Sequence, residues 1–320
     1  MMMKIWVVGS GPMAEAYVKV LKAMHADFLV IGRGEASARK CEEATGCPVI
    51  QGGLSVFLAD QPPACAHAIV CVGVEALADS TAHLLRYGVR SILVEKPAGL
   101  NAAQIEAIAD LCRTQDASVH VAYNRRFFAS VLKAQEIIQQ DGGVTSFNFE
   151  FTEWAHVIEK MTKGEGVLAH WFLANSTHVV DLAFYLGGRP KELFCSTAGS
   201  LAWHPSASVF AGSGVSEGGA LFSYQANWES AGRWCVEVLT RHHRLILRPM
   251  EKLQIQKKGS VDAHFVECDA SLDEQFKPGL FLQTQQFLRG VDTGLCHIDE
   301  QSALMASYGR IAGYKFGSSN

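Results

Sequence analysis

Short apolar runs alternate with longer amphipathic segments through the first 123 residues, and this alternation constrains the fold more than any other feature of the chain. Several runs are almost continuous in Val, Ile and Leu, as expected for strands that are covered on both faces. Between them, apolar residues recur at helical spacing. Strand–helix alternation of this kind predicts parallel βαβ units and a doubly wound sheet. The predicted strands are Ile5–Gly9, Phe28–Gly32, Pro48–Gln51, Ala68–Gly73, Ser91–Glu95 and Ser118–Tyr123.

The pattern changes after about residue 124. A helix is predicted over residues 127–140, and residues 146–151 then alternate polar side chains with phenylalanine, as in a strand with one buried face. More short strands follow, and helices close the chain. We therefore predict an α/β protein with a Rossmann domain and a doubly wound parallel sheet over residues 1–123. Residues 124–320 should form an α+β domain for substrate binding and oligomerisation, with a large, mainly antiparallel open sheet and a last helix able to pack back on the Rossmann domain.

Composition and charge exclude several classes of protein. The 28 Lys and Arg residues nearly balance 32 Asp and Glu residues, so a basic surface for nucleic acid is not expected. No apolar run approaches the ~20 residues that span a bilayer, and the first nine residues lack a secretory-signal pattern. Nine scattered cysteines without a CxxC pair indicate reduced thiols, and no spacing typical of a zinc site occurs. We expect a cytoplasmic protein that binds no metal, nucleic acid or membrane.

The segment Gly9–Ala14 (GSGPMA) follows the first predicted strand and opens the first predicted helix. It is a GxGxxA form of the dinucleotide fingerprint, in which the first glycine permits a tight turn and the second lets the backbone approach a pyrophosphate at the helix N-terminus. A pattern this short also occurs in purely structural turns, but its position at the first strand–helix junction favours a dinucleotide site. The expected cofactor contacts are Gly9, Ser10, Gly11, Pro12, Met13, Arg33, Gly73, Glu95 and Lys96.

The end of the second predicted strand carries information about the type of cofactor. An acidic residue about 20 positions after the fingerprint would bind the ribose 2′-hydroxyl of NAD. Here the strand ends in Gly32-Arg33-Gly34, and the nearest acid, Glu35, comes later. A small residue followed by Arg suits a 2′-phosphate, which predicts NADP(H). NAD is the alternative, with Arg33 then a solvated loop residue.

The fifth predicted strand ends in Glu95-Lys96-Pro97. Ligands of open α/β sheets bind beyond the carboxyl ends of the strands, so Lys96 is expected to face a bound nicotinamide. The following proline restricts the backbone of Lys96 to an extended conformation. A lysine there can donate a hydrogen bond or proton to an oxygen whose carbon exchanges hydride. Taken alone, Glu95-Lys96 is more typical of an ion pair at a surface loop.

Three separated motifs together resemble one known family. The glycine loop, Glu95-Lys96-Pro97 and Tyr123–Phe127 (YNRRF), followed by His178–Leu182 (HVVDL), are similar to the Gfo/Idh/MocA family of oxidoreductases. The resemblance implies a nicotinamide-dependent oxidation or reduction at a carbinol or carbonyl carbon of a sugar, nucleotide sugar or cyclitol. The amino-acid sequence of residues 175–188 is most similar to the corresponding sequence in members associated with cell-surface carbohydrate biosynthesis.

The resemblance also implies roles for individual residues. Lys96 and His178 would be catalytic, with His178 as general acid/base, since an imidazole titrates near neutral pH. Asp181, one helical turn later, would orient the imidazole. The alternative for His178 is a histidine satisfied within a helix packing face, and the alternative for Trp171 is core packing. The expected substrate contacts are Lys96, Asn124, Arg125, Trp171, Asn175 and His178.

Two positions depart from the family pattern. Many members carry Asp four residues before the histidine, where this chain has Ala174 followed by Asn175. An amide can hydrogen-bond a substrate but cannot accept a proton as a carboxylate does. After the fourth predicted strand, family members often have a segment rich in Thr, Pro and Asn, which this chain lacks. Gly73 lies in this segment here, so we expect only the backbone to approach the dinucleotide.

Two functions of a different kind remain as alternatives. One is a non-catalytic dinucleotide or sugar sensor that keeps the fold and regulates a partner, which the loss of an acid at position 174 favours. The other is a reductase acting on a C=N or C=C bond. A separate expectation concerns assembly: Phe147, Phe149 and Phe151 form an apolar sheet face that a second copy of the chain would cover, which predicts a homodimer or homotetramer.

Overall fold

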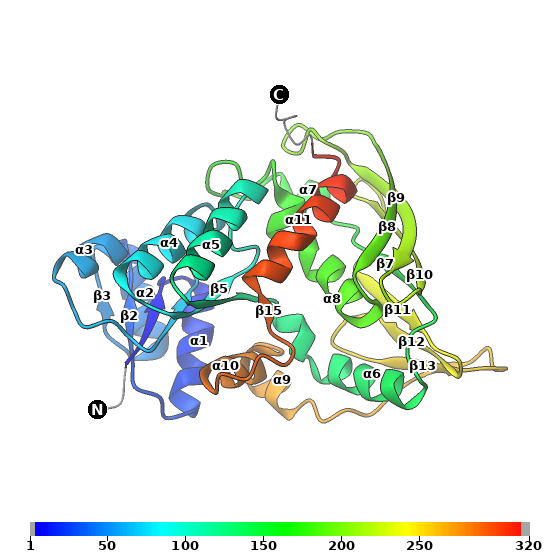
Figure 1. Ribbon diagram of the computed structural model, residues 1–320, viewed down its shortest axis with the longest axis horizontal. Coiled ribbons are helices and arrows are strands. Elements are labelled where there is room, and N and C mark those ends of the chain that lie inside the picture. The colour runs from blue at the N-terminus through cyan, green and yellow to red at the C-terminus, as the bar shows by residue number, and fades with distance from the viewer. Residues whose placement is uncertain (1–3, 315–320) are drawn as a thin grey trace. The chain divides into compact units, whose positions relative to one another are not determined.

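The computed structural model describes residues 4–314 of the chain. It divides into two compact units, each of which has its own sheet (Figure 1). Among the described residues, the first unit contains residues 4–124 and 272–303, and the second contains residues 125–271 and 304–314. The sequence pattern near residue 123 marks the first passage between the units, but it gives no sign that residues 272–303 return to the first.

The first unit is built on a 7-stranded sheet with the order β15-β6-β5-β4-β1-β2-β3. All neighbouring strands are parallel except β15, which pairs antiparallel with β6 at one edge. The interior strand β1 is buried along its whole length, which explains its unbroken apolar run. The predicted doubly wound Rossmann sheet is thereby confirmed. The strands are β1 (Ile5–Val8), β2 (Phe28–Ile31), β3 (Val49–Ile50), β4 (His67–Val70), β5 (Ser91–Glu95), β6 (Ser118–Ala122) and β15 (Cys296–His297).

The helices of the first unit follow from local sequence signals. Helix α1 begins with Pro12 in its first turn, where a missing N–H costs nothing, and buries an apolar stripe that includes Tyr17 and Leu21. In α5, the Asn101 side chain caps the helix by accepting a hydrogen bond of 3.0 Å from the Gln104 amide. The helices are α1 (Pro12–Ala23), α2 (Glu35–Thr45), α3 (Gly53–Ala59), η1 (Val74–Ala76), α4 (Leu77–Tyr87), α5 (Ala102–Thr114) and α10 (Leu280–Leu288).

The second unit is built on an 8-stranded sheet with the order β14-β13-β12-β11-β7-β10-β9-β8. Only the central pair β7 and β10 is parallel, and every other pair of neighbours is antiparallel. The predicted mainly antiparallel open sheet is thereby confirmed. The strands are β7 (Ser146–Glu150), β8 (Pro190–Ala198), β9 (Val209–Ser216), β10 (Leu221–Asn227), β11 (Cys235–Leu239), β12 (His243–Leu247), β13 (Gln254–Lys257) and β14 (Ala263–Phe265).

The phenylalanines of the alternating segment form the core of this unit, not a face between subunits. Phe147, Phe149 and Phe151 are 2%, 2% and 0% exposed. Phe149 packs edge-on against Phe184 of helix α8 at 5.6 Å between ring centroids. Gly187 of the same helix lies so close that a Cβ there would be 2.3 Å from the Phe147 ring. The expectation that a second copy covers these three side chains is wrong, because α8 and the preceding turn η3 of the same chain pack on them.

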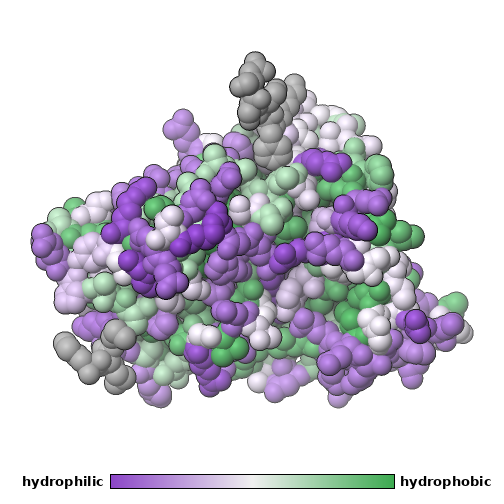
Figure 2. Space-filling model, viewed as in Figure 1, coloured by the Kyte–Doolittle hydropathy of each residue, from purple (hydrophilic) through white to green (hydrophobic). Residues whose placement is uncertain are grey.

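The remaining helices lie in the second unit or join the two units. A π-helical turn, η3, runs without a break into helix α8, and such turns are rare in proteins. Figure 2 shows hydrophilic residues spread over the visible face, with hydrophobic residues in separate groups. No helix within residues 4–314 is both long and apolar enough to span a bilayer. The elements are η2 (Asn124–Phe127), α6 (Ala129–Gln140), α7 (Ala155–Ile158), η3 (Phe172–Ser176), α8 (Thr177–Gly187), α9 (Ser271–Gln275) and α11 (Ile298–Ala312).

Candidate functional site

The glycine loop lies between β1 and α1 and has the geometry of a phosphate cradle. Gly9 has a φ of +133°, and a Cβ at this residue would be 2.6 Å from the carbonyl oxygen of Cys71. Only glycine satisfies both conditions. Gly11 is the N-cap of α1, and no side chain caps this helix end. Its first N–H groups are therefore available to an anion such as a pyrophosphate.

A pocket of about 720 Å³ opens beside this loop in the first unit. Its lining comes from the segments that follow β1, β2 and β4, at the carboxyl ends of parallel strands, where ligands of such sheets bind. The predicted residues Gly9 to Met13, Arg33 and Gly73 all line it, and Glu95 and Lys96 do not. The volume is in the range of small-molecule and cofactor sites. A dinucleotide therefore fits both the loop and the pocket.

The end of β2 leaves no room for an acidic side chain. A Cβ at Gly32 would be 2.8 Å from the hydroxyl oxygen of Ser10 and 2.8 Å from Val49. The Ser10 hydroxyl instead donates a hydrogen bond of 2.9 Å to the Ser37 hydroxyl. Arg33 lines the pocket, and no ion pair to it is found within the described part of the chain. This corner offers two hydroxyls and one guanidinium and lacks the carboxylate that would bind a ribose 2′-hydroxyl.

An acidic residue that the sequence did not single out faces the same pocket. The carboxylate of Glu75 lies over Gly73, since a Cβ at Gly73 would be 2.3 Å from its Oε1 atom. Both residues line the pocket, together with Asp79. A carboxylate accepts hydrogen bonds only, so Glu75 can bind ribose hydroxyls but not a phosphate. No spacing rule identifies Glu75, because its approach to the pocket depends on the turn η1.

The Glu95 side chain is anchored inside the first unit, away from the pocket lining. Its Oε1 atom accepts a hydrogen bond of 2.8 Å from the hydroxyl of Tyr17, a fully buried residue of α1. Burial raises the pKa of the Glu95 carboxyl, while the Tyr17 hydrogen bond and the charges of Lys96 and Lys277 oppose that rise. Burial and the same carboxylate also raise the pKa of Tyr17. Glu95 thus ties the end of β5, where Lys96 follows, to helix α1.

Asn124, the predicted substrate contact at the end of the first unit, is 7% exposed. Its Nδ2 donates a hydrogen bond of 2.8 Å to the carbonyl oxygen of Pro278. The neighbouring Tyr123 hydroxyl donates to Gln301 at 3.1 Å, and Gln301 in turn donates to the Pro97 carbonyl at 3.1 Å. These bonds join the end of β6 to the returning segment 272–303 and to the Glu95-Lys96-Pro97 motif.

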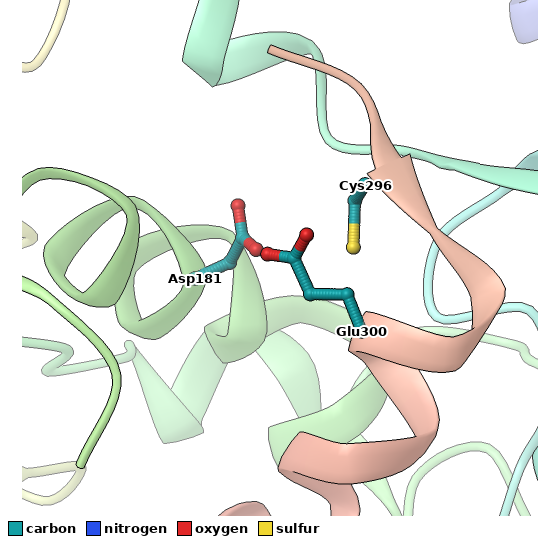
Figure 3. Close-up of side chains that lie close together, drawn as sticks. All are labelled: Asp181, Cys296 and Glu300. Atoms are coloured by element: carbon teal, nitrogen blue, oxygen red, sulfur yellow. The ribbon is translucent and has the colours of Figure 1, made fainter. Parts of the chain in front are cut away.

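In the second unit, Asp181 of α8 forms a buried ion pair with Arg126. Both oxygens of its carboxylate accept hydrogen bonds from the guanidinium, in the two-pronged geometry of strong Arg–carboxylate pairs. The two side chains are 1% and 2% exposed. The Arg126 guanidinium also lies over the Tyr185 ring at 4.6 Å from its centroid. Figure 3 shows the Asp181 side chain projecting from α8. The sequence assigned Asp181 to orienting His178 and gave no sign of this arginine partner.

Figure 3 also shows Cys296, in β15, and Glu300, in the first turn of α11. Both belong to the first unit, and the thiol sulfur and carboxylate oxygen are within 4.8 Å of each other. One thiol and one carboxylate are too few ligands for the usual zinc or calcium geometries. These two residues therefore do not by themselves define a metal site.

The predicted substrate residues of the second unit gather around two tryptophans. His178 is 9% exposed and lies 6.2 Å from Trp234, measured between ring centroids. The Arg125 guanidinium lies over the Trp234 ring at 4.8 Å. Trp171 is 6% exposed and packs edge-on against Trp203 at 6.4 Å. Trp171 is thus packed against another tryptophan, and Trp234, which no motif indicated, is an aromatic side chain close to His178.

The segment before α8 contains a second group that the sequence did not reveal. Asn175 and Ser176, in η3, both donate hydrogen bonds to the carboxylate of Glu153, at 2.8 and 2.9 Å. Glu153 is 2% exposed and follows β7, in a stretch without a recognisable motif. Ala174, which stands at the position where the family pattern has Asp, lies directly before these two residues. A carboxylate is thus present beside this segment after all, supplied by a different element.

Comparisons with known proteins agree with this architecture. Residues 3–123 match the model of the Gfo/Idh/MocA family, described as an oxidoreductase family with an NAD-binding Rossmann fold. No curated protein matches the sequence at a significant level.

Solved structures share the fold over nearly the whole chain. Levoglucosan dehydrogenase, in complex with NADH and L-sorbose, is 16% identical with a TM-score of 0.77, covering 98% of this chain and 96% of that one. UDP-N-acetylglucosamine 3-dehydrogenase from Acidithiobacillus ferrooxidans is 12% identical with a TM-score of 0.74, covering 98% and 97%. A proposed NADPH-dependent oxidoreductase from Desulfitobacterium hafniense is 15% identical with a TM-score of 0.76, covering 97% and 94%. The glycine-loop pocket lies within the segment that matches the family model, so the first domain is a Rossmann domain of the type found in the Gfo/Idh/MocA oxidoreductases.

Proposed function

We propose that the chain is an NAD(P)-dependent dehydrogenase or reductase that acts on a carbinol or carbonyl carbon of a sugar, nucleotide sugar or cyclitol. The observation that carries the proposal is the dinucleotide pocket beside an uncapped helix N-terminus, with Lys96 at the end of a neighbouring parallel strand. Two of the structural relatives are named as dehydrogenases of a sugar and of a nucleotide sugar, which supports the same substrate class here.

The proposal gives each group of residues a separate task. A bound nicotinamide supplies the acceptor or donor of the hydride. Gly9 and the N-terminal N–H groups of α1 would hold the pyrophosphate, and the Glu75 carboxylate would accept hydrogen bonds from ribose hydroxyls. Lys96 donates a hydrogen bond to the substrate oxygen as its charge changes, and the His178 imidazole takes or returns the hydroxyl proton.

This assignment is tested by turnover of a defined panel with NADP⁺ and NAD⁺: levoglucosan, L-sorbose, UDP-N-acetylglucosamine and myo-inositol. The appearance of reduced nicotinamide is followed by absorbance. Lys96→Met and His178→Ala should each lower the rate by about 10²–10⁴-fold, the usual effect of removing a proton-transfer group. If both variants stay within a few-fold of wild type, the assignment fails. Dinucleotide binding without hydride exchange on any sugar would instead support a sensor. A preference for the nucleotide sugar would support a role in cell-surface carbohydrate synthesis.

We further propose that NADP(H) is the preferred cofactor. The support comes from the pocket wall after β2. Arg33 and the hydrogen-bonded hydroxyls of Ser10 and Ser37 line it, and there is no room for an acidic side chain in place of Gly32. A charge-assisted contact to a 2′-phosphate contributes about 1.5–3 kcal/mol, which is roughly a 10- to 150-fold change in affinity. Arg33→Ala should therefore weaken NADPH binding by that factor in a fluorescence titration and leave NADH binding nearly unchanged. Equal effects on both cofactors, or tighter NADH binding by wild type, would contradict NADP preference.

A homodimer or homotetramer remains our proposal for assembly, now on different residues. On the sheet face opposite the phenylalanine core, Phe194 of β8 and Leu221 of β10 are 65% and 62% exposed. Light scattering should show more than a monomer at micromolar concentration, and Phe194→Ser with Leu221→Ser should shift the particles toward monomer. A monomeric wild type would refute the proposal.

A further inference from the structure

Glu153 is a buried carboxylate whose surroundings are unusually specific. Its Oε1 atom accepts both the Asn175 and the Ser176 hydrogen bonds. Its Oε2 atom lies 3.6 Å from a guanidinium nitrogen of Arg233. Taking a carboxylate out of water costs several kcal/mol before pairing offsets it, and a neutral side chain would avoid that cost. The charge therefore needs a reason beyond packing.

Arg233 is held in place by two aromatic rings. Its guanidinium lies 4.8 Å from the centroid of the Trp154 ring and 4.7 Å from that of the Trp234 ring. Cation–π contacts of this kind fix the position of the charge. Since a guanidinium only donates hydrogen bonds, the atom of residue 153 that faces it must be an acceptor.

The same rule fixes the orientation of the Asn175 amide. An ionised carboxylate accepts hydrogen bonds only, so the nitrogen of Asn175 must face Glu153 and its Oδ1 must point elsewhere. Asn175 is partly exposed, and no hydrogen-bond donor to Oδ1 is found among residues 4–314. Its carbonyl oxygen is consequently left as an acceptor for a ligand.

The position of this oxygen connects it to the predicted chemistry. Asn175 lies in η3, which runs directly into α8, three residues before His178. The segment is rigid, since Ser176 and Thr177 are fully buried and the Thr177 hydroxyl donates to the Leu173 carbonyl at 2.8 Å. The Asn175 oxygen lies one helical turn before His178. It can therefore accept a hydrogen bond from a second group of the same substrate whose reacting hydroxyl exchanges its proton with His178.

We propose that Glu153 is a positioning residue that makes Asn175 an obligate hydrogen-bond acceptor for a second, free hydroxyl of the substrate, close to the reacting carbon. The inference rests on the proposed function and deepens it. The substrate class is a polyol or sugar with a vicinal hydroxyl group that is neither oxidised nor alkylated. A substrate lacking that hydroxyl leaves the Asn175 oxygen without its donor, which lowers kcat/KM by about 10- to 100-fold.

The variant Glu153→Gln tests the mechanism because Arg233 dictates how the new amide must lie. The Gln oxygen should face the guanidinium, which turns its nitrogen toward Asn175 and forces that amide to flip and present its NH₂ group. In the double variant Glu153→Gln/Asn175→Asp, the new Gln donates a hydrogen bond and the new Asp accepts it with one carboxylate oxygen. The other oxygen of that Asp then faces the substrate, as the Asn175 oxygen does in the wild type. Asn148→Ala, on the opposite face of the same sheet, is the control.

The readout is the ratio of kcat/KM for the best sugar of the panel to that for each of its monodeoxy analogues. For one analogue, the wild type and Asn148→Ala should show a ratio of about 10–100. Glu153→Gln and Asn175→Ala should show a ratio near 1 for that analogue. The double variant should restore the ratio of the wild type. Side-chain NH₂ signals of ¹⁵N-labelled protein should show the Asn175 resonance moving in Glu153→Gln. A wild type that turns over no sugar overturns the proposed function and this inference together. Turnover with a ratio that Glu153→Gln and Asn175→Ala leave unchanged, or an unmoved Asn175 signal, overturns this inference alone.

Discussion

Replacing Asp181 with Asn would remove the negative charge that the buried Arg126 guanidinium contacts on α8. The two side chains are 1% and 2% exposed, so water cannot replace the lost carboxylate. Breaking a buried pair from one side costs about 3–5 kcal/mol. At 1.4 kcal/mol per tenfold change, the unfolded fraction should rise between about a hundred-fold and a few-thousand-fold. For a unit of this size the melting temperature should fall by roughly 6–20 °C.

The assay is urea unfolding of wild type and Asp181→Asn, followed by circular dichroism. The matched control is Glu136→Gln in the same unit, which breaks the exposed Lys133–Glu136 pair, whose side chains are 34% and 51% exposed. Exposed pairs contribute about 0–1 kcal/mol, so the control should unfold almost as wild type does. Turnover measured well below the melting temperature then separates two roles for Asp181. A structural ion pair predicts activity in proportion to the folded fraction, whereas the orienting role inferred from the sequence predicts a loss of about 10²-fold or more in fully folded protein.

Two results would refute this reasoning. A loss of less than about 1 kcal/mol in Asp181→Asn would show that the ion pair does not carry the stability assigned to it. An equal loss in Glu136→Gln would show that burial does not distinguish the two pairs.

Two other perturbations have defined outcomes. Gly9→Ala should weaken NADPH binding at least tenfold in a fluorescence titration, because φ is +133° and the new Cβ would be 2.6 Å from the Cys71 carbonyl oxygen; unchanged affinity would contradict the cradle geometry. Burial acts to raise the pKa of Asp141, but hydrogen bonds from Thr240 and His243 lower it below its usual value. Because the folded pKa is the lower one, this stabilisation is present above the unfolded pKa of about 4 and is lost as pH falls through the folded pKa. The difference in unfolding free energy between wild type and Asp141→Asn, about 1 kcal/mol, should hold above about pH 5 and shrink as the pH falls below about 4, and parallel profiles across this range would count against it.

The first sheet was predictable because parallel strands that are buried on both faces must be apolar throughout. Each predicted strand of the first 123 residues corresponds to one of β1 to β6. The edge strand β15 was not predicted, since its two residues, Cys296 and His297, are too few to show any periodicity. The alternation at residues 146–151 predicted the strand β7 correctly but not the element that covers it, because a buried face looks the same in sequence whether a helix or another subunit packs on it.

The cofactor loop was predictable from spacing, whereas side-chain partners distant in sequence were not. The Gly9 turn is a local property of six consecutive residues. The contacts of Glu153 and Arg126 join residues 22 and 55 positions apart, and nothing in the local pattern encodes them. The i+3 spacing of His178 and Asp181 suggested a pair, whereas the arginine that contacts Asp181 lies 55 positions earlier and has no local signal in the sequence.

The return of residues 272–303 to the first unit has a consequence for how the chain matures during synthesis. Leu280 and Phe287 of α10 are 0% and 2% exposed, and α10 packs on α1, so the cofactor unit cannot complete its core until they are made. At translation rates of about 5–20 residues per second, residues 1–124 wait on the order of ten to a few tens of seconds for them. During that interval the nascent cofactor unit exposes apolar surface to chaperones. A fragment ended near residue 124 would remain in that incomplete state permanently.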